Sequence, residues 1–82
     1  MNADETLAAL QPIFKDVFDR PSLVIARATT AKDVEDWDSL AHINLVVTIE
    51  KRFKVKFALG ELRSLQNVGN MVDLIVSKLA HA

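Results

Sequence analysis

Apolar residues recur at three- and four-residue steps over residues 4–18, near the start of the chain. The recurring positions are Leu7, Leu10, Phe14, Val17 and Phe18. This spacing predicts an amphipathic helix that buries one face. Pro12 lies inside the pattern, so it either kinks this helix or begins a second helical piece at its own first turn.

The most regular pattern covers residues 39–53, and Asp38 or Ser39 is a suitable N-cap for it. One apolar stripe consists of Leu45, Val46, Ile49 and Phe53. A second stripe lies on another side of the same helix and consists of Leu40, Ile43 and Val47. One stripe must face the core, and the other is either a second packing surface or an exposed docking surface.

Weaker patterns follow this helix. Residues 54–57 alternate like a strand, but no partner strand is evident, so we expect a loop with Val55 and Phe57 turned inward. Residues 59–64 predict a short helical turn that Gly60 weakens. Asn67 is a suitable N-cap for a last helix. The apolar face of that helix consists of Val68, Met71, Val72, Ile75 and Leu79.

These patterns predict an all-α bundle of four helices, three longer and one short. The 82 residues are enough for one domain, 1–82, with a core at about 4–79. Residues 19–38 have no clear period and form a long loop between the first two helices. A loop of this length in a compact domain is usually functional or anchored, and we expect Leu23, Val24 and Ile25 to anchor it in the core.

Composition narrows the possible functions. The net charge of −1 argues against a nucleic-acid binder that works by bulk charge. The chain has no cysteine, which excludes disulfides, thiolate metal sites and a cysteine nucleophile, and its two histidines are too few for a zinc site. No segment has the apolar length of a membrane span, and the acidic start is unlike a signal peptide, so we expect a cytoplasmic protein.

The charges are divided unevenly along the chain. Residues 1–38 hold eight acids and four bases, whereas residues 39–82 hold three acids and six bases. The division falls at Ser39, where the most regular helix begins. A serine at a helix N-terminus is a favourable place for a phosphate ester, because free N–H groups and the helix dipole attract an anion. The acidic run at 33–38 would attract a basic partner.

Asp38-Ser39-Leu40 resembles the attachment motif of the acyl carrier protein family. The resemblance continues through residues 41–46 and 49–53, Leu62 and residues 67–75, and covers about residues 7–79. In that family the serine opens the second helix of a four-helix bundle, after a long first loop. The resemblance therefore implies a carrier protein and not an enzyme.

The family's chemistry implies a role for each matching residue. Ser39 would become a phosphoserine that carries 4′-phosphopantetheine, transferred from coenzyme A by a phosphopantetheinyl transferase, and Asp38 would help that enzyme engage. The arm's thiol would hold an acyl group as a thioester, which supplies the thiol that the chain lacks. Partner docking would fall to Asp36, Leu40, Ile43 and Val47. The core, and in some members the acyl chain, would be lined by Leu45, Val46, Ile49 and Phe53.

One departure from the family's pattern concerns partners. Members that serve fatty-acid synthesis have a second helix rich in acids, which docks on basic patches. Here the corresponding face carries Ala41, Asn44, Lys51 and Arg52, with Glu50 as its one acid. We therefore expect a specialised, monomeric carrier in a lipid or secondary-metabolite pathway, served by a dedicated acyl ligase, acyltransferase or synthase.

Two alternatives remain open on the sequence. A stand-alone aminoacyl or peptidyl carrier would use Ser39 in the same way. An unmodified helical interaction module would not use it, and a DNA-binding version would need polar side chains at the start of its recognition helix, where Leu40 and Ala41 stand here. For His42 we expect a packed or hydrogen-bonded side chain and not a catalytic base, since no third group is evident to orient it. Trp37 is expected to be partly buried.

Overall fold

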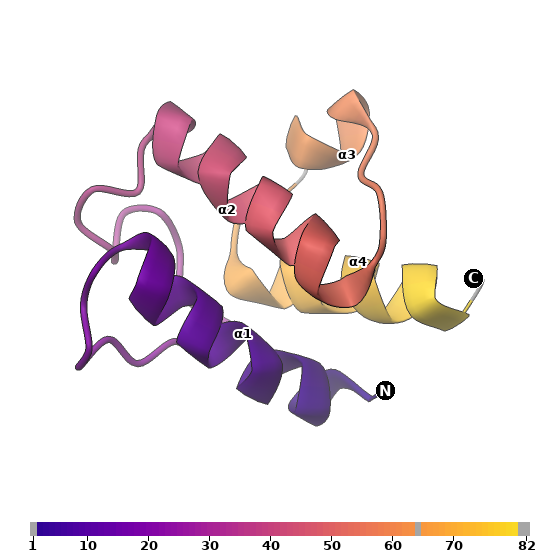
Figure 1. Cartoon of the computed structure of the whole chain (residues 1–82), viewed down its shortest axis with the longest axis horizontal. Coiled ribbons are helices and arrows are strands. Elements are labelled where there is room, and N and C mark those ends of the chain that lie inside the picture. Colours follow the sequence, from indigo (N-terminus) through magenta and orange to yellow (C-terminus); the bar gives the residue numbers. More distant parts are fainter. Residues whose placement is uncertain (1, 64, 81–82) are drawn as a thin grey trace.

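The computed structural model describes residues 2–63 and 65–80, and this part of the chain forms four helices (Figure 1). They are α1 (Ala3–Val17), α2 (Ser39–Phe53), α3 (Leu59–Arg63) and α4 (Val68–Ala80). The predicted all-α architecture is confirmed, with three longer helices, one short one and a long loop between α1 and α2. Among the described residues, no helix has the length and apolar character that a membrane span requires.

α1 begins with a capping box that involves two side chains. The Asn2 side chain accepts a hydrogen bond from the Glu5 amide at 2.8 Å, and the Glu5 carboxylate accepts one from the Asn2 amide at 3.1 Å. The helix then runs through Pro12 as one element, so the predicted second helical piece does not form. Pro12 lies on the exposed side, where water can solvate the carbonyl that the missing N–H leaves free.

α2 has the predicted bounds, and Asp38 is its N-cap. The Asp38 carboxylate accepts a hydrogen bond from the Ala41 amide at 2.9 Å. The helix ends at Lys54, which adopts the left-handed conformation with φ 57°. The first stripe lies fully in the core, as predicted, and consists of Leu45, Val46, Ile49 and Phe53. The second stripe is exposed.

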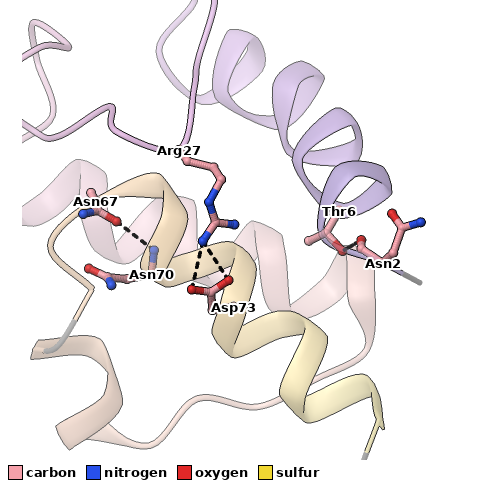
Figure 2. Close-up of polar contacts among 6 residues, drawn as sticks. All are labelled: Asn2, Thr6, Arg27, Asn67, Asn70 and Asp73. Atoms are coloured by element: carbon pink, nitrogen blue, oxygen red, sulfur yellow. Dashed lines mark hydrogen bonds and ion pairs between the residues drawn. The ribbon is translucent and has the colours of Figure 1, made fainter.

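The start of α4 also matches its prediction. The Asn67 side chain accepts a hydrogen bond from the Asn70 amide at 2.8 Å, as an N-cap residue does (Figure 2). Four residues of its apolar face are fully buried, and Leu79 is half-buried against the core. The buried four are Val68, Met71, Val72 and Ile75.

The long loop is anchored to α1 by one side chain that sequence reasoning missed. The Gln11 amide donates to the Leu23 carbonyl at 2.6 Å and accepts from the Ile25 amide at 2.9 Å. Ile25 is buried and Leu23 half-buried, as expected. The prediction that Val24 packs into the core is wrong, because its side chain is 80% exposed. Neighbouring residues of an extended segment point to opposite sides, so Leu23 and Ile25 face inward and Val24 faces outward.

The same loop is attached to the start of α4 (Figure 2). The Arg27 guanidinium donates to both carboxylate oxygens of Asp73, at 2.9 and 3.0 Å. The Arg27 carbonyl accepts from the Gly69 amide at 2.8 Å, and the Thr29 carbonyl from the Val68 amide at 2.9 Å. A Cβ atom at Gly69 would lie 3.0 Å from the Arg27 carbonyl oxygen, so a larger residue would push the loop backbone away from α4.

α3 is tied to α4 through Glu61. Its carboxylate lies 2.9 Å from the Lys78 ammonium and accepts a hydrogen bond from the Ala58 amide at 2.7 Å. The backbone hydrogen bond from Ala58, and then the contact with Lys78, lower the pKa of Glu61 below its ordinary value of 4.5. The ionised form of Glu61 therefore stabilises the position of α3.

We predict that Glu61→Gln weakens the attachment of α3 and reduces the sensitivity of the fold to acid. A carboxyl whose pKa is lowered on folding stabilises the fold above its unfolded pKa, and this stabilisation disappears as pH falls through the folded pKa. Thermal unfolding at pH 7 and pH 3.5 should therefore show a smaller loss of Tm in Glu61→Gln than in the natural protein. The control Asp16→Asn changes an exposed acid on α1 and should leave that loss unchanged. An equal loss in all three proteins would contradict the role of Glu61.

Candidate functional site

Ser39 is the first residue of α2, and its side chain is exposed to solvent. Asp38 uses its carboxylate to bond the Ala41 amide and its carbonyl to bond the His42 amide at 2.9 Å. The first-turn amides of Ser39 and Leu40 have no carbonyl one turn earlier within the helix to bond. An anion attached to the Ser39 hydroxyl would therefore lie beside free N–H groups at the positive end of the helix dipole.

Trp37 sets the position of this helix start. Its indole is 8% exposed and packs edge-on against Phe14, with ring centroids 5.4 Å apart and an interplanar angle of 78°. The Phe18 ring also packs on the indole, with the two ring centroids 6.0 Å apart. The predicted burial of Trp37 is confirmed. The residue two positions before Ser39 is thus held in the aromatic part of the core.

His42 is hydrogen-bonded to Trp37, and the prediction of a packed or hydrogen-bonded side chain is confirmed. The indole Nε1–H donates to His42 Nδ1 at 3.1 Å, and the two rings are stacked with centroids 6.1 Å apart. No hydrogen bond joins His42 to Ser39 among the described residues, and the imidazole lacks the arrangement of a catalytic base. His42 is therefore bonded to the buried Trp37 and is not paired with Ser39.

A hollow of about 650 Å³ opens between α2 and α3 with Ser39 at its edge. We call it the α2–α3 hollow. Apolar side chains form most of its wall, namely Trp37, Ile43, Leu59, Leu62 and Leu65. Leu59 is 69% exposed even though it is a large apolar residue. The hollow is a suitable place for a flexible, partly apolar group attached to Ser39.

The four residues predicted to dock partners come together on a second surface. Asp36, Leu40, Ile43 and Val47 line a shallow hollow of about 570 Å³ along α2. The exposed fractions of Leu40, Ile43 and Val47 are 77%, 56% and 40%. We call these four residues the docking face. A surface of exposed apolar side chains beside an acid is typical of a protein-interaction site.

The two ends of the docking face differ in charge. At the Ser39 end, Asp36 lies 3.6 Å from Arg20, which also bonds Glu35. At the other end, Val47 adjoins a hollow of about 370 Å³, whose basic lining consists of Lys51, Lys54 and Lys56. These three lysines form no ion pair within the described residues. The surface is therefore acidic beside Ser39 and basic at the far end of α2.

Glu50, the one acid of α2, is bound within the protein. Its carboxylate accepts a hydrogen bond from the Phe57 amide at 2.8 Å, and its carbonyl bonds the amides of the loop that follows the helix. The Glu50 carboxylate is therefore partly occupied by the protein's own backbone. Glu50 keeps its negative charge and lines the same hollow as the three lysines, so bases outnumber acids there by three to one.

The residues predicted to line the core do so, but they do not reach the hollow beside Ser39. Leu45 and Ile49 are fully buried, and Val46 and Phe53 nearly so. None of the four contributes to the wall of the α2–α3 hollow. Their burial is confirmed, whereas shelter of an acyl chain by these residues stays a prediction.

Sequence reasoning missed two features of the site. The wall that Leu59 and Leu62 provide comes from a five-residue helix with too few positions for a periodic signal. The bond between Trp37 and His42 joins a loop residue to a helix residue, so neither helical nor strand spacing predicts it. The short helical turn predicted over residues 59–64 gave the place of this wall in the chain but not its position beside Ser39.

Comparison with known proteins supports the resemblance to acyl carrier proteins. A family model described as a phosphopantetheine attachment site matches residues 8–75. The chain is 29% identical over 82 residues to an acyl carrier protein of Acidothermus cellulolyticus, covering all of this chain and 98% of that protein. It is 55% identical to the holo acyl carrier protein from Geobacter metallireducens, whose solution structure superposes with a TM-score of 0.88 and covers 93% of this chain and 87% of that one. The chain therefore belongs to the acyl carrier protein family and is a non-catalytic carrier of acyl groups linked to phosphopantetheine.

Proposed function

We propose that Ser39 is the residue that receives the 4′-phosphopantetheine arm. The observation that carries this proposal is the position of an exposed serine at the first turn of α2, within Asp38-Ser39-Leu40 and at the edge of the α2–α3 hollow. Its hydroxyl is accessible to a transferase, and the helix N-terminus stabilises the phosphodiester that forms. When attached, the arm supplies a thiol that holds an acyl group as a thioester.

The proposed transferase contact involves the acids before α2. Asp38 fixes the first turn through its bond to the Ala41 amide, and Asp36 stands exposed on the docking face. A phosphopantetheinyl transferase with basic groups around its active site would be attracted to these carboxylates. Coenzyme A is the donor of the arm, and we place the protein's work in the cytoplasm, where that donor is available.

We further propose that the carrier serves a specialised lipid or secondary-metabolite pathway. Its support is the charge beyond the docking face, where Lys51, Lys54 and Lys56 surround Glu50, the one acid of α2, whose carboxylate also binds the Phe57 amide. An acyl ligase, acyltransferase or synthase that docks here would present an acidic group opposite these lysines. Like charges opposed across an interface disfavour binding, so partners with wholly basic docking patches would be rejected.

An aminoacyl or peptidyl carrier remains the second candidate, since it would use the same serine. The α2–α3 hollow favours the acyl carrier, because its wall is mostly apolar and Leu59 is left exposed beside it. An unmodified interaction module would use the docking face but have no need for Ser39. Modification of Ser39 separates that class from both carriers.

We predict that a phosphopantetheinyl transferase loads the protein at Ser39. Incubation with coenzyme A, Mg²⁺ and a broad-specificity phosphopantetheinyl transferase should add the mass of one phosphopantetheine to the protein. Ser39→Ala should abolish this gain, because no hydroxyl remains at the helix start. Ser22→Ala removes another exposed serine within the matched region and should load normally. Intact-protein mass spectrometry gives the answer, and a mass gain that survives Ser39→Ala would overturn the assignment.

The second prediction concerns the acids beside Ser39. Asp36→Asn with Asp38→Asn should slow loading by about threefold to tenfold at low salt, through loss of electrostatic attraction. Both changes suit the fold, since asparagine is a good N-cap at position 38 and tolerates the φ of 72° at position 36. The difference should shrink as salt screens the charges.

A matched control for this prediction is Asp16→Asn with Asp19→Asn. It removes the same charge, and Asp19 also has a positive φ, of 51°. Loading rates should stay at the natural level in this control. Equal loading of the natural protein and the 36/38 variant at low salt would contradict the proposed role of the acids.

The third prediction concerns partner choice. Lys51→Glu with Lys56→Glu should strengthen binding of the loaded carrier to a bacterial fatty-acid ketoacyl synthase that has a basic docking patch. Two repulsive contacts would become attractive, which corresponds to about a tenfold fall in Kd. The control Lys15→Glu with Lys32→Glu makes the same charge change outside the docking face and should have little effect. Tight binding of the natural carrier, unimproved by the variant, would argue against a specialised partner.

A further inference from the structure

Two hollows meet at the start of α2, so an arm on Ser39 has two directions available. The α2–α3 hollow includes His42 and Leu59, whereas the docking face includes Leu40 and Val47. Asp38 and Ile43 line both the α2–α3 hollow and the shallow hollow of the docking face. A carrier whose arm lay along the docking face would cover the surface that its partners must reach. A group that directs the arm into the α2–α3 hollow would keep that surface free.

His42 is the polar side chain placed to give this direction. It stands three residues after Ser39, so the two side chains lie on the same face of the helix, about 5–6 Å apart at their Cβ atoms. Helical side chains lean toward the N-terminus, and His42 therefore leans over the turn that Ser39 begins. Its side chain lines the α2–α3 hollow and not the docking face.

The hydrogen bond with Trp37 fixes what His42 can offer. Because the indole Nε1–H donates to Nδ1, that nitrogen carries no proton and the imidazole proton lies on Nε2. No hydrogen bond occupies Nε2 among the described residues, and His42 has no buried nitrogen without a partner. Nε2–H is therefore an accessible donor, and the stacked Trp37 ring limits the rotation of the imidazole.

We propose that His42 is a positioning residue whose Nε2–H donates to the phosphodiester of the arm on Ser39 and thereby directs the arm into the α2–α3 hollow. This proposal rests on Ser39 as the attachment site. The phosphodiester is the first strong acceptor of the arm and an anion, so a bond from a fixed N–H is favourable. The chain of contacts runs from the buried aromatic cluster through Trp37 and His42 to the arm.

The first test leaves His42 unchanged and compares the protein before and after loading. A long-range ¹H–¹⁵N NMR spectrum of the imidazoles, with His81→Gln to remove the second one, should show His42 with its proton on Nε2. Loading with phosphopantetheine should then shift the Nε2–H signal downfield. A proton on Nδ1, or a signal that loading leaves unmoved, would overturn the proposal.

The second test follows the arm in loaded variants. Nuclear Overhauser contacts between the two methyl groups of the pantetheine arm and the Leu59 and Leu62 side chains report the α2–α3 hollow. We expect at least a threefold loss of their intensity in His42→Leu, and recovery in His42→Gln, whose amide can donate. Asn44→Leu makes a similar change in the shallow hollow along α2, beside the docking face, and should keep the contacts.

These outcomes separate this proposal from the assignment of Ser39. Full loading of His42→Leu, with native circular dichroism and unchanged arm contacts, would overturn the role of His42 alone. A natural protein that gains no phosphopantetheine mass would instead overturn the attachment site. A variant that loads fully and loses the contacts supports positioning and excludes a role of His42 in the transfer itself.

Discussion

The burial of Trp37 against Phe14 and Phe18 is the constraint on which the functional end of the molecule depends. An aromatic side chain of this size removes much apolar surface from water, and its edge-on contact adds specific geometry. The backbone turns at Asp36, just before Trp37, and the two residues after Trp37, Asp38 and Ser39, are exposed to solvent. The loop therefore delivers Ser39 to the surface at a position fixed by the core.

One apolar stripe of α2 packs in the core, and the other is exposed to solvent. The buried stripe, with Leu45 and Ile49 at its centre, gives the helix its place in the bundle. Because this packing already holds the helix in place, Leu40 and Ile43 can stay exposed to water, although exposed apolar side chains ordinarily favour aggregation. α3 is held by the ion pair of Glu61 with Lys78, and its residues Leu59 and Leu62 line the same hollow as Ser39.

The sequence predicted those parts of the structure that depend on a repeating spacing. The bounds of α2 and the buried faces of α2 and α4 followed from helical periodicity, and the caps Asp38 and Asn67 from the chemistry of helix starts. The loop had no period, so the outward turn of Val24 and the bond between Trp37 and His42 could not be predicted. They depend on the path of the loop across the bundle, which long-range contacts such as that of Gln11 determine.

The near-zero net charge of the chain says little about its partners, because the fold uses some charges internally and leaves others free. Glu50 and Glu61 both bond backbone amides, and Asp73 holds Arg27. The lysines at the end of α2 form no ion pair within the described residues, so they remain available to a partner. The acids at the Ser39 end are partly used, since Asp36 pairs with Arg20 and Asp38 caps α2, but both side chains stay exposed to solvent. The exposed charge therefore changes sign from these acids to the lysines at the far end of α2. A partner that matches both ends can bind in one direction only, which would bring its active site to the Ser39 end of the docking face.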